Sequence, residues 1–90
     1  MPAIHLSIVG RVQGVGFRWF VRVVGRKLGL SGWVRNRDDG SVEVAASGPA
    51  EKLAELRRQV ARGPDGAHVA DVRDLEEVSE ELEFPFGMRR

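Results

Sequence analysis

The chain has 90 residues, which is enough for one domain with a small hydrophobic core. Its composition, 42% hydrophobic and 30% charged, is that of a folded globular protein and excludes an intrinsically disordered one. The sequence contains no cysteine, which excludes disulfides and thiolate chemistry, and its net charge of +1 argues against a nucleic-acid binder held mainly by its electrostatic field.

The sequence also bears on membrane association. No apolar run approaches the roughly 18 residues that a membrane-spanning helix requires. The N-terminus lacks the pattern of a signal peptide. We therefore expect a cytoplasmic, monomeric protein that has neither a membrane nor a nucleic acid as a partner.

The first two predicted elements flank a glycine-rich segment. Residues 3–10 alternate, with Ile4, Leu6 and Ile8 on one side, which predicts a half-buried strand. Residues 17–28 predict a helix, because their apolar side chains recur at the spacing of one helical face. The apolar positions of that face are Phe17, Phe20, Val21, Val24 and Leu28.

Two strands and a second helix are predicted next. Residues 31–36 and 41–47 are typical of strands, and the Asp39-Gly40 pair between them indicates a hairpin turn. Pro49 is expected in the first turn of the helix that follows, a position that proline favours.

The C-terminal third predicts two more strands. Residues 67–75 form the first of these, and their imperfect alternation indicates a bulge or an early end. The acidic residues 76–81 are expected to form a solvated turn. Residues 82–86 alternate as a last strand, which Pro85 confines to a sheet edge because proline cannot donate a ladder hydrogen bond.

The order of these elements predicts an α+β fold of the ferredoxin-like, split βαβ type. It reads β-α-β-β-α-β with a short additional strand at the C-terminus. Two helices would cover one face of a mainly antiparallel sheet. Residues 1–90 are expected to form this single domain.

The glycine-rich segment, residues 10–18, has two interpretations. Gly10, Gly14 and Gly16 separate the first strand from the first helix, and Arg18 closes the run. In such a turn, backbone N–H groups can point at an anion, so the segment could be a phosphate cradle with Arg18 as its cationic partner. The alternative is a tight turn in which the glycines only supply unusual backbone angles.

Topology adds Asn36 to this end of the sheet. A strand–helix–strand crossover makes the first two strands parallel, so their carboxyl ends lie at the same end of the sheet. Asn36 ends the second strand and is therefore expected near Arg18. A neutral amide beside an anion cradle could hold a water molecule. Alternatively, Asn36 only begins the hairpin turn, where asparagine is favoured.

At these residues the sequence resembles the acylphosphatase family. Residues 9–18, Val-Gly-Arg-Val-Gln-Gly-Val-Gly-Phe-Arg, are similar to its first signature, G-x-V-Q-G-V-x-F-R. Residues 32–36, Gly-Trp-Val-Arg-Asn, with Gly40 and Gly48 after them, are similar to its second. The similarity covers nearly the whole chain, and it departs from the family pattern at residues 84–88, where a more regular strand is usual.

The resemblance implies hydrolysis of acyl phosphates to a carboxylate and inorganic phosphate. Arg18 matches the phosphate-binding arginine, and Asn36 matches the asparagine that orients the attacking water. We expect no cofactor and no metal, since Arg18 and the loop N–H groups would supply the positive charge. The expected substrate-binding residues are Val12, Gln13, Gly14, Val15, Gly16, Phe17 and Arg18.

Other phosphate and nucleotide motifs fit poorly. A P-loop requires a lysine after its last glycine, and the dinucleotide fingerprint fails at its third glycine. An RNA-recognition domain shares the predicted element order, but residues 41–47 carry no aromatic platform for bases. The remaining alternative is a non-catalytic domain of the same fold that binds a phosphate ligand or regulates another activity.

Overall fold

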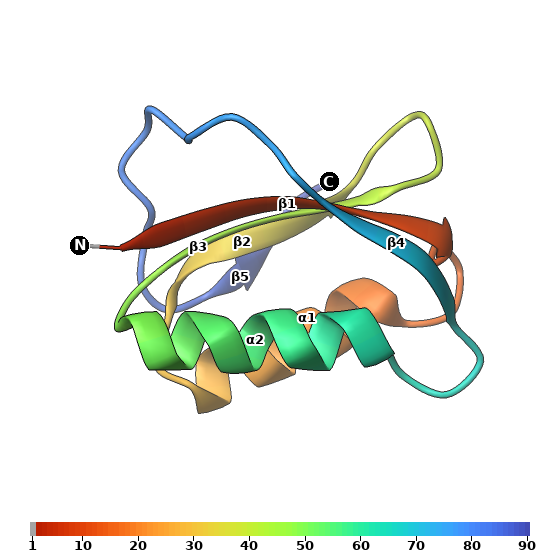
Figure 1. The fold of residues 1–90 in the computed structure, drawn as a ribbon, viewed down its shortest axis with the longest axis horizontal. Helices are drawn as coiled ribbons and strands as arrows, with labels where there is room; N and C mark the ends of the chain where they lie inside the picture. Colours follow the sequence, from red (N-terminus) through yellow and green to blue (C-terminus); the bar gives the residue numbers. More distant parts are fainter. Residues whose placement is uncertain (1) are drawn as a thin grey trace.

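The computed structural model describes residues 2–90, which contain five strands and two helices (Figure 1). The elements are β1 (Ala3–Arg11), α1 (Phe17–Lys27), β2 (Ser31–Asn36), β3 (Val42–Ser47), α2 (Ala50–Arg62), β4 (His68–Asp74) and β5 (Gly87–Met88). The strands form one sheet in the order β4-β1-β3-β2-β5. All pairings are antiparallel except that of β5 with β2.

This topology confirms the predicted ferredoxin-like α+β fold. β1 and β2 are both antiparallel to β3, which lies between them, so they run in the same direction as expected. Both helices lie on one side of the sheet (Figure 1). The carboxyl ends of β1 and β2 therefore share one end of the molecule, and the loop before α1 begins there.

The hydrophobic core fills the space between the sheet and the two helices. It is built from side chains that alternate along the strands and recur along one face of each helix. Its largest members are fully buried, which gives the loops at the sheet end a rigid base. These members are Leu6, Ile8, Val12, Phe17, Val21, Leu30, Val34, Val42, Val44, Leu56, Val60 and Phe86.

The opposite face of the sheet carries a polar cluster under the segment that joins β4 to β5. The Glu43 carboxylate accepts hydrogen bonds from His5 Nε2 at 2.5 Å and from Arg35 Nε at 2.7 Å. The backbone carbonyl of Glu76 lies 2.6 Å from the other ring nitrogen of His5. Burial raises the pKa of Glu43, but the hydrogen bonds from His5 and Arg35 outweigh burial and bring this pKa below its ordinary value.

The predicted last strand at residues 82–86 is wrong. The extended pair is Gly87–Met88, which adds to the edge of the sheet beside Trp33 and Val34. The alternation fails because Phe86 is fully buried whereas Phe84 is 69% exposed. Phe86 packs against Gly25 of α1, where a Cβ atom would lie only 2.6 Å from its ring. The strand at this edge of the sheet is therefore β5, formed by the two residues that follow the predicted segment.

Smaller differences concern element ends. β3 begins at Val42 rather than at residue 41, and Pro49 is the N-cap of α2 instead of a first-turn residue. The irregularity expected in the fourth strand is confirmed as a register shift opposite Val9 and Gly10, which leaves Ala70 unpaired. Neither helix of residues 2–90 has the length and apolar character needed to cross a bilayer.

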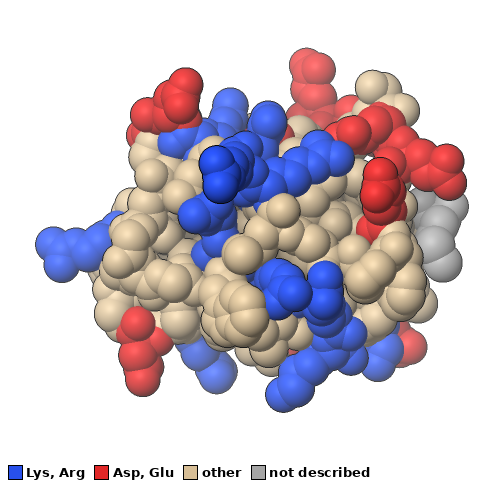
Figure 2. Space-filling model, turned by 180° about the vertical axis from the view of Figure 1, so that it is seen from behind, with Lys and Arg blue, Asp and Glu red and all other residues tan. Residues whose placement is uncertain are grey.

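Charge is unevenly distributed over the surface. Figure 2 shows two groups of Lys and Arg side chains, one above and one below the centre of the face seen from behind Figure 1, with acidic side chains mainly toward its margins. Because the whole chain carries a net charge of only +1, this is a local concentration of positive charge. Such a surface attracts small anions.

Candidate active site

The loop between β1 and α1 is anchored at both ends by buried side chains. Val12 is fully buried at its start, and Phe17 is 1% exposed at its end, where α1 begins. Both belong to the hydrophobic core cluster. The loop backbone is therefore held in place by packing, as a preorganised anion site requires.

Two glycines give this loop its path. Gly14 and Gly16 each have a φ of 76°, in the left-handed region that other residues rarely adopt. Gly16 is also the N-cap of α1, and its carbonyl accepts the hydrogen bond of Phe20. The first N–H groups of α1 have no partner within the helix, so the turn leaves donors at the positive end of the helix dipole.

The side chain of Gln13 ties the loop to the hairpin that follows β2. Its amide donates to the carbonyl oxygens of Arg37 at 2.8 Å and Ser41 at 2.9 Å. The role of Gln13 in this structure is therefore to hold the hairpin in position against the loop. Neither Gln13 nor Val15 lines the cavity described next.

A cavity of about 200 Å³ lies at the end of the sheet where β1 and β2 finish. It brings together Arg18 and Asn36, as the topology predicts, with four of the other residues expected to bind substrate. Its walls are Val12, Gly14, Gly16, Phe17, Arg18, Trp19, Asn36 and Met88. Arg18 is the only ionisable side chain in this wall, so the cavity carries a cation and has no carboxylate or imidazole.

Arg18 is half-buried and is held by Arg89, the residue that follows β5. Its Nη1 donates to the carbonyl oxygen of Arg89 at 3.2 Å. The Arg89 N–H in turn donates to the carbonyl of Val34 in β2 at 2.8 Å. The guanidinium has further N–H groups that can point into the cavity as a fork, the geometry that matches two phosphate oxygens.

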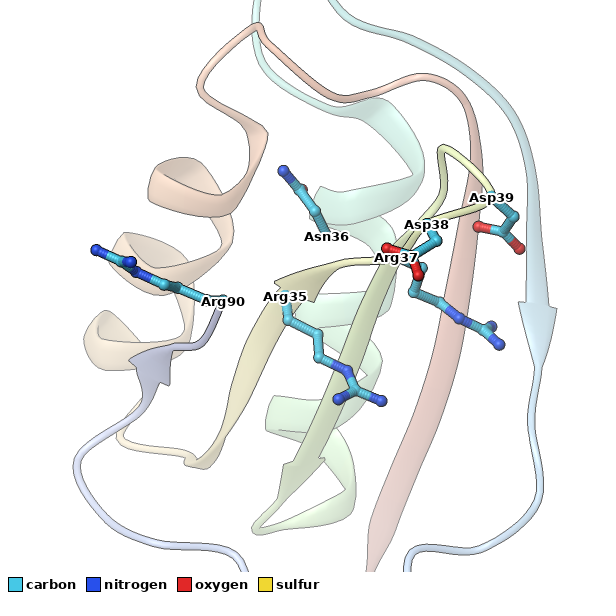
Figure 3. A pocket seen from close by; sticks show the side chains of 6 residues that line it. All are labelled: Arg35, Asn36, Arg37, Asp38, Asp39 and Arg90. Carbon is cyan, nitrogen blue, oxygen red and sulfur yellow. The ribbon is translucent and has the colours of Figure 1, made fainter.

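Asn36 reaches the cavity because of strand alternation. It is the last residue of β2, two positions after the fully buried Val34, so both side chains lie on the helix-bearing face. Figure 3 shows the Asn36 amide directed away from Arg35, which leaves the strand toward the opposite face. The amide offers a donor and an acceptor to a molecule in the cavity.

A second, larger hollow adjoins the first at Asn36. It measures about 470 Å³ and is lined by Arg35, Asn36, Arg37, Asp38, Asp39 and Arg90. Arg90 points away from Arg35 and Arg37, so the three guanidinium groups do not meet at one centre (Figure 3). Arg35 is already paired with Glu43. The carboxylates of Asp38 and Asp39 oppose these cations. Hydrogen bonds from Ser41 lower the pKa of Asp39, which favours its charged form.

Sequence reasoning missed two residues of the cavity wall, Trp19 and Met88. Trp19 could have been predicted, because it directly follows Arg18, a candidate phosphate-binding residue. Met88 could not be found this way, since only the pairing of β5 with β2 brings it there. Among residues 2–90, no group of three or more His, Asp or Glu side chains could hold a metal ion.

Comparison with known proteins assigns the family. A family model described as Acylphosphatase matches residues 4–86. The acylphosphatase of Koribacter versatilis is 53% identical over 74 residues, which cover 82% of this chain and 66% of that protein. The acylphosphatase of Sinorhizobium medicae is 46% identical over 93% of this chain and 87% of its own length.

A solved structure gives the same result for the fold. The crystal structure of acylphosphatase from Bacillus subtilis covers 100% of both chains with a TM-score of 0.92 at 40% identity. The match therefore includes the elements that build the cavity, α1, β2 and the loop between β1 and α1. Together, the family match over residues 4–86 and these relatives show that the chain belongs to the acylphosphatase family.

Proposed function

We propose that this protein hydrolyses acyl phosphates, releasing a carboxylate and inorganic phosphate. The observation that carries the proposal is the meeting of Arg18, Asn36 and the glycine-rich loop in one cavity. The names of the curated relatives and the family match support the same hydrolase function.

The phosphoryl group would bind against the loop and the start of α1. N–H groups of residues 12–17 and the fork of Arg18 would donate to its oxygens. Because the loop is anchored by Val12 and Phe17, these donors are in place before the charge of the transition state develops. Phosphoryl transfer depends mostly on such positioning and charge stabilisation.

Asn36 would hold the attacking water. The water oxygen forms a bond to phosphorus while the bond from phosphorus to the acyl oxygen breaks, and the electron pair leaves on the carboxylate. The cavity wall offers no carboxylate or imidazole as a general base. The proton of the water would therefore pass to a phosphate oxygen, which becomes part of the product.

The function is tested by hydrolysis of benzoyl phosphate in a buffer that contains a metal chelator. We expect turnover of benzoyl phosphate, seen as a fall in absorbance, and negligible turnover of p-nitrophenyl phosphate. The second substrate is a phosphate ester with a poorer leaving group, so it serves as the control. Binding of inorganic phosphate without any turnover would instead support a non-catalytic phosphate-binding domain.

We also propose that the protein acts as a cytoplasmic monomer with a small-molecule substrate. One chain supplies both Arg18 and Asn36, so the cavity needs no residue from a second copy. We expect a single species of about 10 kDa in sedimentation, and a specific activity that does not change with protein concentration.

A further inference from the structure

Two exposed apolar side chains lie at the cavity that holds Arg18 and Asn36. Trp19 is 58% exposed and Met88 is 44% exposed, and both line its wall. Within residues 2–90, only Val23 and Phe84 are other large apolar side chains with comparable exposure. Exposed apolar groups gathered at a pocket that also holds polar groups are typical of ligand-binding sites.

Folding does not explain the position of Trp19. The buried residues of α1 are Phe17, Val21, Val24 and Gly25, and Trp19 lies on a different face from them. Val23 follows Trp19 by four positions, so these two exposed side chains share one face of α1. The Arg22 guanidinium lies 4.8 Å from the centre of the indole ring and restrains it.

Met88 belongs to the same wall but comes from another element. It is the last residue of β5 and pairs with Val34 of β2, while Trp19 lies in the first turn of α1. A methionine adapts its shape and makes favourable contacts with aromatic rings. Trp19 and Met88 therefore present a flat aromatic surface and a deformable one within a single 200 Å³ cavity.

We propose that Trp19 and Met88 form the subsite for the acyl group, and that this subsite selects apolar and in particular aromatic acyl phosphates. The inference rests on the proposed function. In an in-line displacement, the acyl oxygen leaves on the side of phosphorus opposite to the attacking water. Because Asn36 would hold the water, the acyl group points away from Asn36.

The larger hollow beyond Asn36 is not the acyl subsite. It adjoins the cavity on the side of the water, and its walls carry charges of both signs. Arg90 points away from Arg35 and Arg37 (Figure 3), and Arg35 is paired with Glu43. A preference for acyl groups that carry a carboxylate is therefore not expected.

Selectivity among three substrates tests the proposal. We expect kcat/KM for benzoyl phosphate to exceed that for acetyl phosphate about tenfold, the size of effect that one aromatic contact gives. Succinyl phosphate, whose acyl group carries a carboxylate, should resemble acetyl phosphate. Trp19→Ala and Met88→Ala should each reduce the ratio of benzoyl to acetyl phosphate, whereas Trp19→Phe should keep most of it. Phe84→Ala is the matched control, because Phe84 is 69% exposed but lies outside the cavity wall, and its ratio should equal that of wild type.

A binding measurement without turnover provides the second test. The chain has two tryptophans, so in a Trp33→Phe background the fluorescence reports on Trp19 alone. Benzylphosphonate should change this fluorescence and bind about tenfold more tightly than methylphosphonate. In Trp19→Ala, measured by calorimetry, the difference in affinity between the two phosphonates should become smaller, and in Phe84→Ala it should stay as in wild type.

The outcomes separate this inference from the proposed function. Hydrolysis of all three acyl phosphates with equal efficiency, or a ratio that Trp19→Ala does not change, overturns the acyl subsite and leaves the hydrolase function in place. A preference for succinyl phosphate overturns it in favour of the charged hollow. Failure to hydrolyse any of the three overturns the proposed function itself.

Discussion

The guanidinium of Arg18 and the backbone carbonyl of Arg89 are joined by a hydrogen bond of 3.2 Å, although 71 positions separate these residues. The Arg89 N–H donates to Val34 of β2, two positions before Asn36. The end of the chain thus links the helix that carries the cation to the strand that carries the amide. An arginine already held by a fixed acceptor loses less freedom when it binds an oxyanion.

Arg18→Gln should reduce kcat/KM for an acyl phosphate about 100-fold or more, because one charge-bearing donor to the transition state is lost. Since Arg18 is half-buried and outside the core cluster, the variant should fold normally, which circular dichroism checks. Arg58→Gln, on the exposed side of α2, is the matched control and should keep full activity. Near-normal turnover by Arg18→Gln would contradict the role given to this residue.

Asn36→Ala should lower kcat by about 100-fold with little change in KM, since orienting water matters in the transition state more than in the bound substrate. Inhibition by inorganic phosphate should be unchanged, because the loop and Arg18 remain. Steady-state kinetics with phosphate as a competitive inhibitor measures both quantities. A large rise in KM with an unchanged kcat would assign Asn36 to substrate binding instead.

Gly16→Ala should lower the free energy of unfolding by about 1–2 kcal/mol. It should also lower the specific activity, and by more than the control variant described below. The φ of 76° is strained for alanine, although a Cβ atom would meet no other atom within 4 Å. Relief of this strain would turn the N–H groups of the loop away from the cavity. Urea unfolding and benzoyl phosphate kinetics measure the two effects.

Gly66→Ala is the matched control for this prediction. Gly66 has a φ of 89° in the loop after α2, again with nothing within 4 Å of a Cβ atom. It should show a similar loss of stability and full specific activity. Equal activity losses in both variants would mean that the loop before α1 has no special role.

Gln13→Ala should destabilise the protein by about 1–2 kcal/mol, because two carbonyls of the hairpin lose their amide donor. Activity should fall as well, since the loop and the strand that carries Asn36 are no longer tied together. Urea unfolding monitored by tryptophan fluorescence gives the free energy. Gln59→Ala on α2 is the control. If Gln59→Ala loses as much stability as Gln13→Ala, the two hydrogen bonds of Gln13 have no specific role in joining the loop to the hairpin.

Glu43 predicts a dependence of stability on pH. Hydrogen bonds from His5 and Arg35 outweigh burial and lower its folded-state pKa below the ordinary 4.5. A carboxyl with a lowered pKa contributes stability above its unfolded pKa and loses that contribution as pH falls through the folded pKa. The free energy of unfolding should therefore fall as pH drops from about 4.5 toward the folded pKa, and it should fall less steeply in Glu43→Gln. Identical slopes for the two proteins would show that this carboxyl is not the group responsible.

The loop before α1 and the two elements beside it were predicted correctly from local sequence patterns. The alternation of residues 3–10, the helical spacing after Phe17 and the glycines between them predicted the correct elements to within one or two residues. Such patterns are local, because periodicity and backbone freedom are properties of neighbouring residues. The expected convergence of Arg18 and Asn36 also followed from the sequence, since crossover topology obeys a general rule.

The C-terminal segment shows where local patterns failed. The alternation of residues 82–86 predicted a strand, but Phe86 turns into the core because α1 has a glycine at position 25 to receive its ring. No pattern within the segment contains that information.

By itself, the sequence therefore determined the fold class, the position of the glycine-rich loop and the placement of Arg18 and Asn36 at the same end of the sheet. Only the tertiary structure decided that Gln13 bonds to the hairpin, that Arg89 holds the cation, and that Trp19 and Met88 line the cavity with them. The physical reason is that these contacts join residues distant in the chain through specific side-chain shapes. The periodicity of a sequence does not predict contacts of this kind, because it depends only on neighbouring residues.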